Sequence, residues 1–150
     1  KVAQRFYEIS KKENSNSFLR INGDSPLIDY RLIDYCIEQF EKSKLDILTN
    51  SFPKTFPKGQ GVEIIKSKVF QKEFKNIKSK KDLEHVFPYF YRNKSKFKFK
   101  NINCKENLNM INLSVDTFED LLRIRKLLSK SKNVTPSLSK LVNKNIKLYY

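Results

Sequence analysis

The sequence predicts an α/β fold in which helices pack against a layered, largely parallel sheet. Segments with helical apolar spacing alternate along the chain with short apolar segments that are typical of strands, and this alternation is the pattern of a layered α/β sheet. The chain has 150 residues, of which 39% are hydrophobic. This length fits one domain with room for a sizeable core.

Helices are expected where apolar residues recur at three- and four-residue spacing. The segments with this spacing are 2–12, 29–43, 67–75, 83–92 and 121–128. Asp29 is a suitable N-cap for the second of them. Ser79 and Thr117 each have an aspartate three residues further on, which is the spacing of a capping box at a helix start. Pro88 is expected to kink or shorten its helix, because proline lacks a backbone N–H.

Short apolar segments bounded by turn residues predict the strands. These segments are 18–22, 45–49, 62–66, 96–103 and 112–115. Residues 96–100, KFKFK, alternate lysine with phenylalanine, which is the period of a strand with one solvent-facing side. The stretch SFPKTFPKGQG (51–61) holds two prolines and two glycines and is predicted to be a loop. Residues 131–150 form a lysine-rich tail.

Charge and cysteine content narrow the function only in part. The formal net charge is +15, from 31 basic and 16 acidic residues. This favours an anionic partner such as nucleic acid, a nucleotide, an acidic sugar or a membrane surface, although lysine and asparagine also abound where nucleotide composition biases a sequence. Cys36 and Cys104 have no CxxC spacing and the chain has one histidine, which argues against a zinc site or a disulfide framework. No apolar run approaches the roughly 20 residues that span a bilayer, so a reduced, cytoplasmic compartment is expected.

Asp24 and Asp116 are expected to meet at one edge of the sheet. Each follows a predicted strand, and ligands of open α/β sheets bind outside the carboxyl ends of the strands. Two carboxylates there can hold Mg²⁺, which takes oxygen ligands at about 2.1 Å and completes its shell with water and phosphates. Gly23 has no Cβ, so its backbone can approach a nucleotide closely. Alternatively, Asp24 only begins a turn and Asp116 only helps to cap the following helix.

Four segments in this order resemble one known family. They are RINGDSPLID (20–29), TNSFPKTFPKGQGVEI (49–64), EHVFPYFYRN (84–93) and NLSVDTFEDL (112–121). They resemble the cytidylyltransferases that activate acidic sugars, which include CMP-KDO synthetases, CMP-sialic acid synthetases and SpsF-like spore-coat polysaccharide proteins. The last group is the most similar, with its GD-x-PLID element, PRG-like loop before a VE strand, EHV-x-PY helix and VDT-x-ED-L ending.

The resemblance implies a nucleotide-diphosphosugar-transferase-like fold, a Rossmann-like three-layer arrangement with a mixed, mostly parallel sheet. Residues 1–130 match the C-terminal part of the catalytic domain, and 131–150 are left as the lysine-rich tail. The implied reaction is Mg²⁺-dependent: CTP and an acidic sugar give a CMP-sugar and pyrophosphate in surface polysaccharide biosynthesis. The resemblance also implies a homodimer, with neither nucleic acid nor membrane as a partner.

The resemblance also assigns roles to individual residues. Asp24 and Asp116 match metal ligands of the family. Asn22 and Gly23 belong to the same glycine–aspartate element and are expected to contact substrate. Lys58, Glu63 and His85 match positions that face the sugar. The simpler alternatives are a solvated lysine at 58, a glutamate at 63 that pairs with a neighbouring lysine, and a hydrogen-bonded structural histidine at 85.

The sequence departs from the family pattern at two places. Family members begin with a strand and an LPGK-like loop that holds the CTP triphosphate, and no such segment precedes Lys1 in this chain. A catalytically incomplete fragment with a binding role is therefore an alternative. Gln60 and Gly61 stand where the most similar members have an apolar residue and an aspartate, which leaves the identity of the sugar open.

A basic nucleic-acid-binding module is the remaining alternative. Lysines of residues 96–100 could contact phosphates, and Phe97 and Phe99 could stack on bases. The period-2 alternation of lysine and phenylalanine argues against a nucleic-acid-binding module. If both phenylalanines face the core, they are not available for stacking, and the lysines are an ordinary protection of an edge strand.

Overall fold

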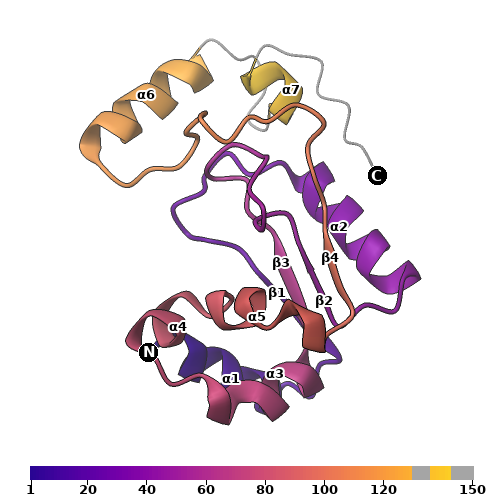
Figure 1. Cartoon of the computed structure of the whole chain (residues 1–150). Coiled ribbons are helices and arrows are strands. Elements are labelled where there is room, and N and C mark those ends of the chain that lie inside the picture. Colours follow the sequence, from indigo (N-terminus) through magenta and orange to yellow (C-terminus); the bar gives the residue numbers. More distant parts are fainter. Residues whose placement is uncertain (130–135, 143–150) are drawn as a thin grey trace.

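The computed structural model describes residues 1–129 and 136–142, so most of the predicted tail 131–150 lies outside the described residues. Figure 1 shows the arrangement of the elements. In chain order they are α1 (Val2–Lys12), β1 (Ser17–Arg20), α2 (Tyr30–Lys42), β2 (Ile47–Thr49), β3 (Glu63–Lys66), α3 (Ser67–Glu73), the 3₁₀ turn η1 (Phe74–Asn76), α4 (Lys80–His85), α5 (Pro88–Arg92), η2 (Lys94–Lys96), β4 (Phe99–Asn101), α6 (Phe118–Ser129) and α7 (Leu138–Leu141).

The four strands form one mixed sheet in the order β1-β3-β2-β4. One row of paired residues crosses one end of the sheet and contains Arg20, Glu63, Thr49 and Asn101. At this end, called the cleft end below, β1, β2 and β4 finish and β3 begins. The α/β class with a mixed sheet is confirmed. Three of the four described strands, β1, β2 and β4, run in the same direction, and β3 runs antiparallel to both of its neighbours.

The sheet separates two hydrophobic clusters, because successive side chains of a strand point to opposite faces. On one face, Leu48 and Ile64 pack with residues of α2. On the other face, Ile47 and Ile65 pack with Phe70 of α3 and with residues of α1 and α5. Figure 1 shows α2 alone on one side, and α1, α3, α4 and α5 grouped on the other. Removal of these apolar side chains from water stabilises the resulting three layers.

The predicted helix starts are confirmed. The Asp29 carboxylate accepts a hydrogen bond from the backbone N–H of Arg31, and the Ser79 hydroxyl accepts one from the N–H three residues on. The Thr117 hydroxyl accepts one from the N–H of Asp120 at the start of α6. Pro88 begins α5, so the expected interruption of the helix separates α4 from α5.

The strand expected over residues 112–115 is wrong. Only Asn112 makes an isolated bridge, and its partner is Lys58 in the loop 51–61 rather than a strand of the sheet. Further along, the N–H of Val115 donates to the carbonyl of Asp24 at 2.8 Å. The local apolar pattern predicted an extended backbone correctly, but the partners of that backbone are two loops, which no local pattern specifies.

Gly59 allows the loop 51–61 to lie directly against this segment. Its φ is +89°, and a Cβ at this position would lie 2.8 Å from the carbonyl carbon of Leu113. A side chain there would therefore be strained and would also collide with backbone. This loop and the segment after β4 are thus held together at the cleft end.

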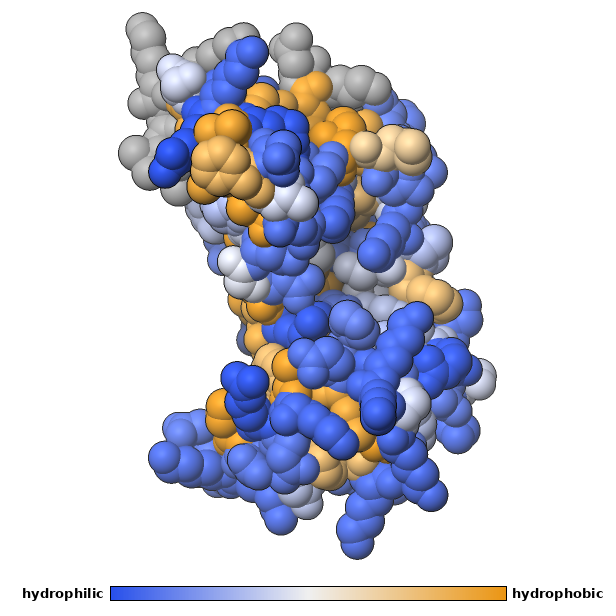
Figure 2. Space-filling view, turned by 90° about the vertical axis from the view of Figure 1, so that its left-hand side faces the viewer, coloured by the Kyte–Doolittle hydropathy of each residue, from blue (hydrophilic) through white to orange (hydrophobic). Residues whose placement is uncertain are grey.

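The surface is mainly hydrophilic. On the face shown in Figure 2, hydrophobic residues form separate patches in the upper and lower parts of the molecule. Both cysteines are free and buried. Within residues 1–129 and 136–142, none of the helices combines the length and the apolar character needed to cross a bilayer.

Candidate active site

Two adjoining cavities lie at the cleft end of the sheet. The first, called the Asp24 cavity, has a volume of about 210 Å³, and three of the predicted site residues line it: Asn22, Asp24 and Lys58. The second, called the His85 cavity, has a volume of about 320 Å³, and its lining includes Asn22, Glu63 and His85. Both linings contain Asn22, Ser51, Lys54 and Gly61. The two cavities therefore form one continuous cleft.

Asp116 and Asp24 lie around the same lysine at this cleft. The Lys58 ammonium donates to Asp116 Oδ2 at 2.6 Å, and the Ser114 hydroxyl donates to the same oxygen at 3.0 Å. The backbone hydrogen bond between Val115 and Asp24 brings the second aspartate alongside. The hydrogen bond to Asp116 raises the pKa of Lys58, and the negative charges of Asp116, Asp120 and Asp24 raise it further. The two distant aspartates thus lie near the same lysine, and their role as metal ligands stays a prediction.

The helix start near Asp116 is capped by another residue. Asp120 Oδ2 accepts hydrogen bonds from the backbone N–H groups of Asp116 and Thr117. Its Oδ1 accepts from Arg123 at 2.6 Å, and this hydrogen bond is the main reason why the pKa of Asp120 falls to about 2. Since Asp120 and Thr117 cap α6, the Asp116 carboxylate points to Lys58 instead. The helix-capping alternative for Asp116 is therefore not what its side chain does.

Asp24 does lie in a turn, as its simpler interpretation expected. The N–H of Ser25 donates to the carbonyl of Asn22, and the Ser25 hydroxyl donates to Asp24 Oδ1 at 3.0 Å. The Asp24 side chain is half-buried and also lines the cleft, so the turn serves to present it. A Cβ at Gly23 would meet nothing within 4 Å. No protein contact thus requires glycine there, and its role toward a nucleotide stays a prediction.

Glu63 is buried, and its ion-pair partner is an arginine rather than the lysine of its simpler interpretation. Arg20 donates to Glu63 Oε2 at 2.5 Å across β1 and β3, and the Tyr91 hydroxyl donates to Oε1. Burial raises the pKa of Glu63 above its ordinary value, although the Arg20 charge and the Tyr91 hydrogen bond favour the ionised form. The same burial raises the pKa of Tyr91.

His85 ends α4 with an exposed side chain at the His85 cavity. In the described part of the chain its imidazole has no hydrogen-bond partner. A role as a hydrogen-bonded structural residue therefore finds no support, and the ring is free to contact a ligand in the cavity.

Several residues that shape the cleft have no distinctive sequence signal. Gln60 is fully buried, with its amide donating to the carbonyl of Leu27 and its oxygen accepting from the N–H of Asp29. These bonds fasten the loop 51–61 to the turn after Asp24. Arg20 and Lys54 were also not predicted. Both lie inside the matched segments 20–29 and 49–64, but an arginine or lysine in so basic a chain carries little information by itself.

The donor set at the rim fits a hard divalent cation. No three His, Cys, Asp or Glu side chains among the described residues form a group able to hold a metal ion. Mg²⁺, however, is commonly bound through one or two carboxylates, with water and substrate phosphates completing its shell. The carboxylates of Asp116 and Asp24 favour positive charge at this position, which the Lys58 ammonium now occupies beside Asp116.

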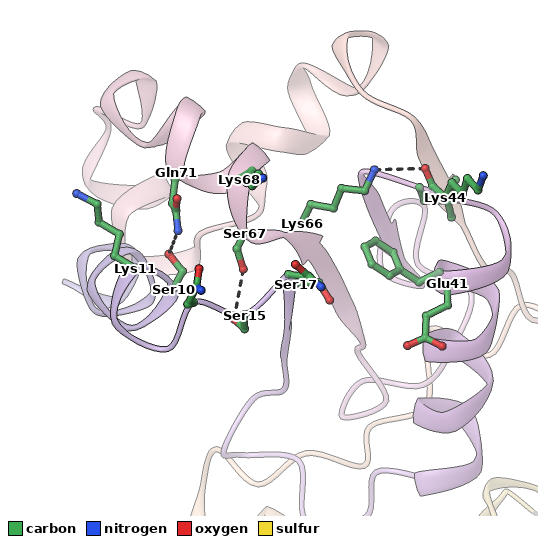
Figure 3. Close-up of a pocket in the computed structure, with 14 residues that line it drawn as sticks. Ser10, Lys11, Ser15, Ser17, Glu41, Lys44, Lys66, Ser67, Lys68 and Gln71 are labelled. Carbon is green, nitrogen blue, oxygen red and sulfur yellow. Dashed lines mark hydrogen bonds between the residues drawn. The ribbon is translucent and has the colours of Figure 1, made fainter.

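A larger cavity lies at the opposite end of the sheet and is a weaker candidate. It has a volume of about 610 Å³, is called the Phe40 cavity here, and contains none of the predicted site residues. Figure 3 shows that some of its polar groups bond to the protein itself: Lys66 reaches the backbone of Lys44, and Gln71 reaches Ser10. The Lys66 ammonium also pairs with Asp46 at 2.9 Å. Size alone therefore does not identify the functional site.

Known proteins that are similar to this chain indicate its family. Residues 1–148 match the model of a family described as cytidylyltransferase. The uncharacterized protein MJ1063 of Methanocaldococcus jannaschii is 35% identical over 121 residues, which cover 79% of this chain and 49% of that protein. The chain thus spans about half the length of this curated relative. The structure of a cytidylyltransferase from Leptospira borgpetersenii serovar Hardjo-bovis superposes with a TM-score of 0.88 and 26% identity, over 99% of this chain and 67% of the other.

Proposed function

The chain belongs to the cytidylyltransferase family, and from this premise we propose that the protein transfers CMP from CTP to an acidic sugar and releases pyrophosphate. Its SpsF-like segments support a place in surface polysaccharide biosynthesis, carried out in the cytoplasm. A homodimer, as in many family members, remains part of the proposal.

The convergence of Asp24 and Asp116 on Lys58 is the observation that carries this proposal. The two aspartates are 92 positions apart in the sequence and lie at one rim of the cleft. Carboxylates placed beside a cation in this way suit the binding of a phosphate-bearing substrate together with Mg²⁺.

In the proposed reaction, a hydroxyl oxygen of the sugar attacks the α-phosphorus of CTP and forms a new O–P bond. The bond from that phosphorus to the bridging oxygen breaks, and pyrophosphate leaves with the electron pair. The hydroxyl proton passes to water in the open cleft. Asp24 and Asp116 are the residues that would hold Mg²⁺, which supplies charge neutralisation at the phosphates when bound. Catalysis is then mainly positioning and electrostatic stabilisation.

The His85 cavity suits an acidic acceptor. Three cationic side chains, Arg20, Lys54 and Lys81, line it together with one carboxylate, that of Glu63. The positive excess favours a carboxylate-bearing sugar over a neutral one. His85, at the end of α4, adds a ring nitrogen that can bond to a hydroxyl or to a carboxylate.

No observation favours the nucleic-acid alternative. Phe97 and Phe99 are partly buried and pack against the core cluster that contains Phe90. The Phe90 and Phe97 ring centroids are 5.6 Å apart, and Phe99 lies edge-on to Tyr91. These rings are therefore not displayed for base stacking. An incomplete fragment with only a binding role remains the alternative that activity measurements address.

The proposal is tested by pyrophosphate release from the full-length protein with CTP, Mg²⁺ and acidic sugars. Asp24→Asn and Asp116→Asn are each expected to lower the rate by at least about 100-fold, because each removes a carboxylate that would hold Mg²⁺ beside the transferring phosphate. Asp34→Asn, an exposed position on α2, is the matched control and should retain the wild-type rate. Wild-type activity in both cleft variants would refute the metal assignment, and its absence in the wild type would refute the reaction.

A further inference from the structure

We infer that Lys54 is a catalytic residue that contacts the transferring α-phosphoryl group where the two cavities of the cleft meet. This inference rests on the proposed function and deepens it. Nothing in the segments that match the family assigned a role to this residue.

The position of Lys54 follows from the geometry of the cleft. A group that passes between two substrates must lie where both substrates touch. The phosphates are expected beside Asp24 and Asp116, and the acceptor is expected in the His85 cavity. The atoms that react therefore lie near the residues that line both cavities, which are Asn22, Ser51, Lys54 and Gly61. Lys54 is the cation among them.

The other cations of the cleft are placed differently. Arg20 pairs with Glu63 at 2.5 Å and Lys58 pairs with Asp116 at 2.6 Å. Lys81 lines only the His85 cavity. Among the described residues, the Lys54 ammonium forms no ion pair within 4 Å, although its positive charge still favours the ionised form of Glu63. Lys54 is thus a cation that can meet a phosphate without first leaving a carboxylate.

The backbone that carries Lys54 is anchored on both sides. Ser51 and Lys54 form an antiparallel bridge, so the loop turns tightly at this point. The side chain of Asn101, the last residue of β4, accepts from the N–H of Phe52 at 2.9 Å and donates to the carbonyl of Pro53 at 3.2 Å. Although the lysine side chain is exposed, its Cα is held against the end of the sheet. A charge on a fixed backbone loses less entropy when it meets a substrate.

The chemical role follows from the charge of the reacting group. As the sugar oxygen approaches the α-phosphorus and pyrophosphate departs, negative charge is distributed over the phosphoryl oxygens and the leaving oxygen. An ammonium beside these oxygens stabilises the transition state more than the bound substrates, and therefore raises kcat.

The experiment compares Lys54→Ala, Lys54→Arg and Lys68→Ala in the full-length protein. Lys68 is exposed at the Phe40 cavity and controls for the general loss of one positive charge. We expect Lys54→Ala to lower kcat for pyrophosphate release by about 100-fold, with KM for CTP changed less than about threefold. Lys54→Arg should restore at least about a tenth of the rate, because it returns the charge. Lys68→Ala should match the wild type.

The outcomes separate this inference from the proposed function. An active wild type with a Lys54→Ala variant within about twofold of its kcat refutes the role of Lys54 and leaves the reaction standing. A Lys54→Ala variant that loses activity only through KM for CTP also refutes it, since that pattern indicates ground-state binding. A wild type that does not release pyrophosphate refutes the proposed function, and the role of Lys54 with it.

Discussion

The cleft contains two ion pairs of nearly equal length in very different surroundings. Arg20 and Glu63 are 2.5 Å apart, and their side chains are only 16% and 10% exposed. Lys58 and Asp116 are 2.6 Å apart, and theirs are 53% and 42% exposed. The first pair joins two strands and has Tyr91 as a third member. The second joins two loops, which the isolated bridge at Lys58 holds together.

The difference indicates which pair can exchange partners. A buried charge that loses its partner remains buried without compensation, which costs a large amount of free energy. Arg20 and Glu63 are therefore expected to stay paired when a ligand enters the cleft. An exposed pair is weakened by water and salt and is worth little to stability. Lys58 and Asp116 can therefore separate when phosphates or a cation arrive. The buried pair is therefore the stronger one in the structure, and the exposed pair is the one that ligands can reach.

The largest expected effect on stability comes from breaking the buried pair. Arg20→Ala leaves the Glu63 carboxylate buried without its cation, and we expect a loss of about 3–5 kcal/mol in the free energy of unfolding. Urea denaturation followed by circular dichroism measures this loss. Lys58→Ala is the matched variant for the exposed pair and should leave the urea midpoint unchanged within error. Equal losses in the two variants would contradict the comparison.

A smaller effect is expected from the tyrosine that completes the buried pair. Tyr91→Phe removes the hydroxyl that donates to Glu63, and we expect a cost of about 1.5–3 kcal/mol for this hydrogen bond to a charged group. Tyr89→Phe offers a close control. Its hydroxyl donates to Glu73 at 2.7 Å, but that carboxylate is more exposed than Glu63. The same denaturation experiment should show the smaller loss for Tyr89→Phe, and the reverse order would argue against burial as the cause.

The smallest expected effects are shifts in titration, which should have opposite signs in the two pairs. Burial raises the pKa of Glu63, so its protonation stabilises the fold at low pH, and this contribution is lost as pH rises from 4.5 through the folded pKa. The Lys58 hydrogen bond lowers the pKa of Asp116, so its contribution is present above 3.8 and is lost as pH falls through the folded pKa. Carbon-13 NMR of the carboxyl groups measures both midpoints. Midpoints shifted in the same direction would contradict the assignment.

Local patterns predicted the helices well because their causes are local. The Asp29, Ser79 and Thr117 caps and the break at Pro88 each depend on residues within one helical turn. The failure at residues 112–115 has the opposite cause, since extended backbone can pair with a strand or with a loop and its own residues do not distinguish them. For the same reason no local pattern specified that β3 runs antiparallel to its neighbours, because the direction of β3 depends on the path of the loop 51–61.

The sequence by itself determined the alternation of elements, the helix boundaries and, through four spaced segments, the family and the candidate residues Asp24, Asp116, Lys58, Glu63 and His85. Only the tertiary structure decided which charges pair, since Glu63 takes Arg20 from the neighbouring strand and Asp116 takes Lys58 from a loop 58 positions earlier. The physical reason is the separation along the chain over which each interaction acts. Capping and periodicity act over a few residues, whereas burial and ion pairing depend on which distant backbones meet at the end of the sheet.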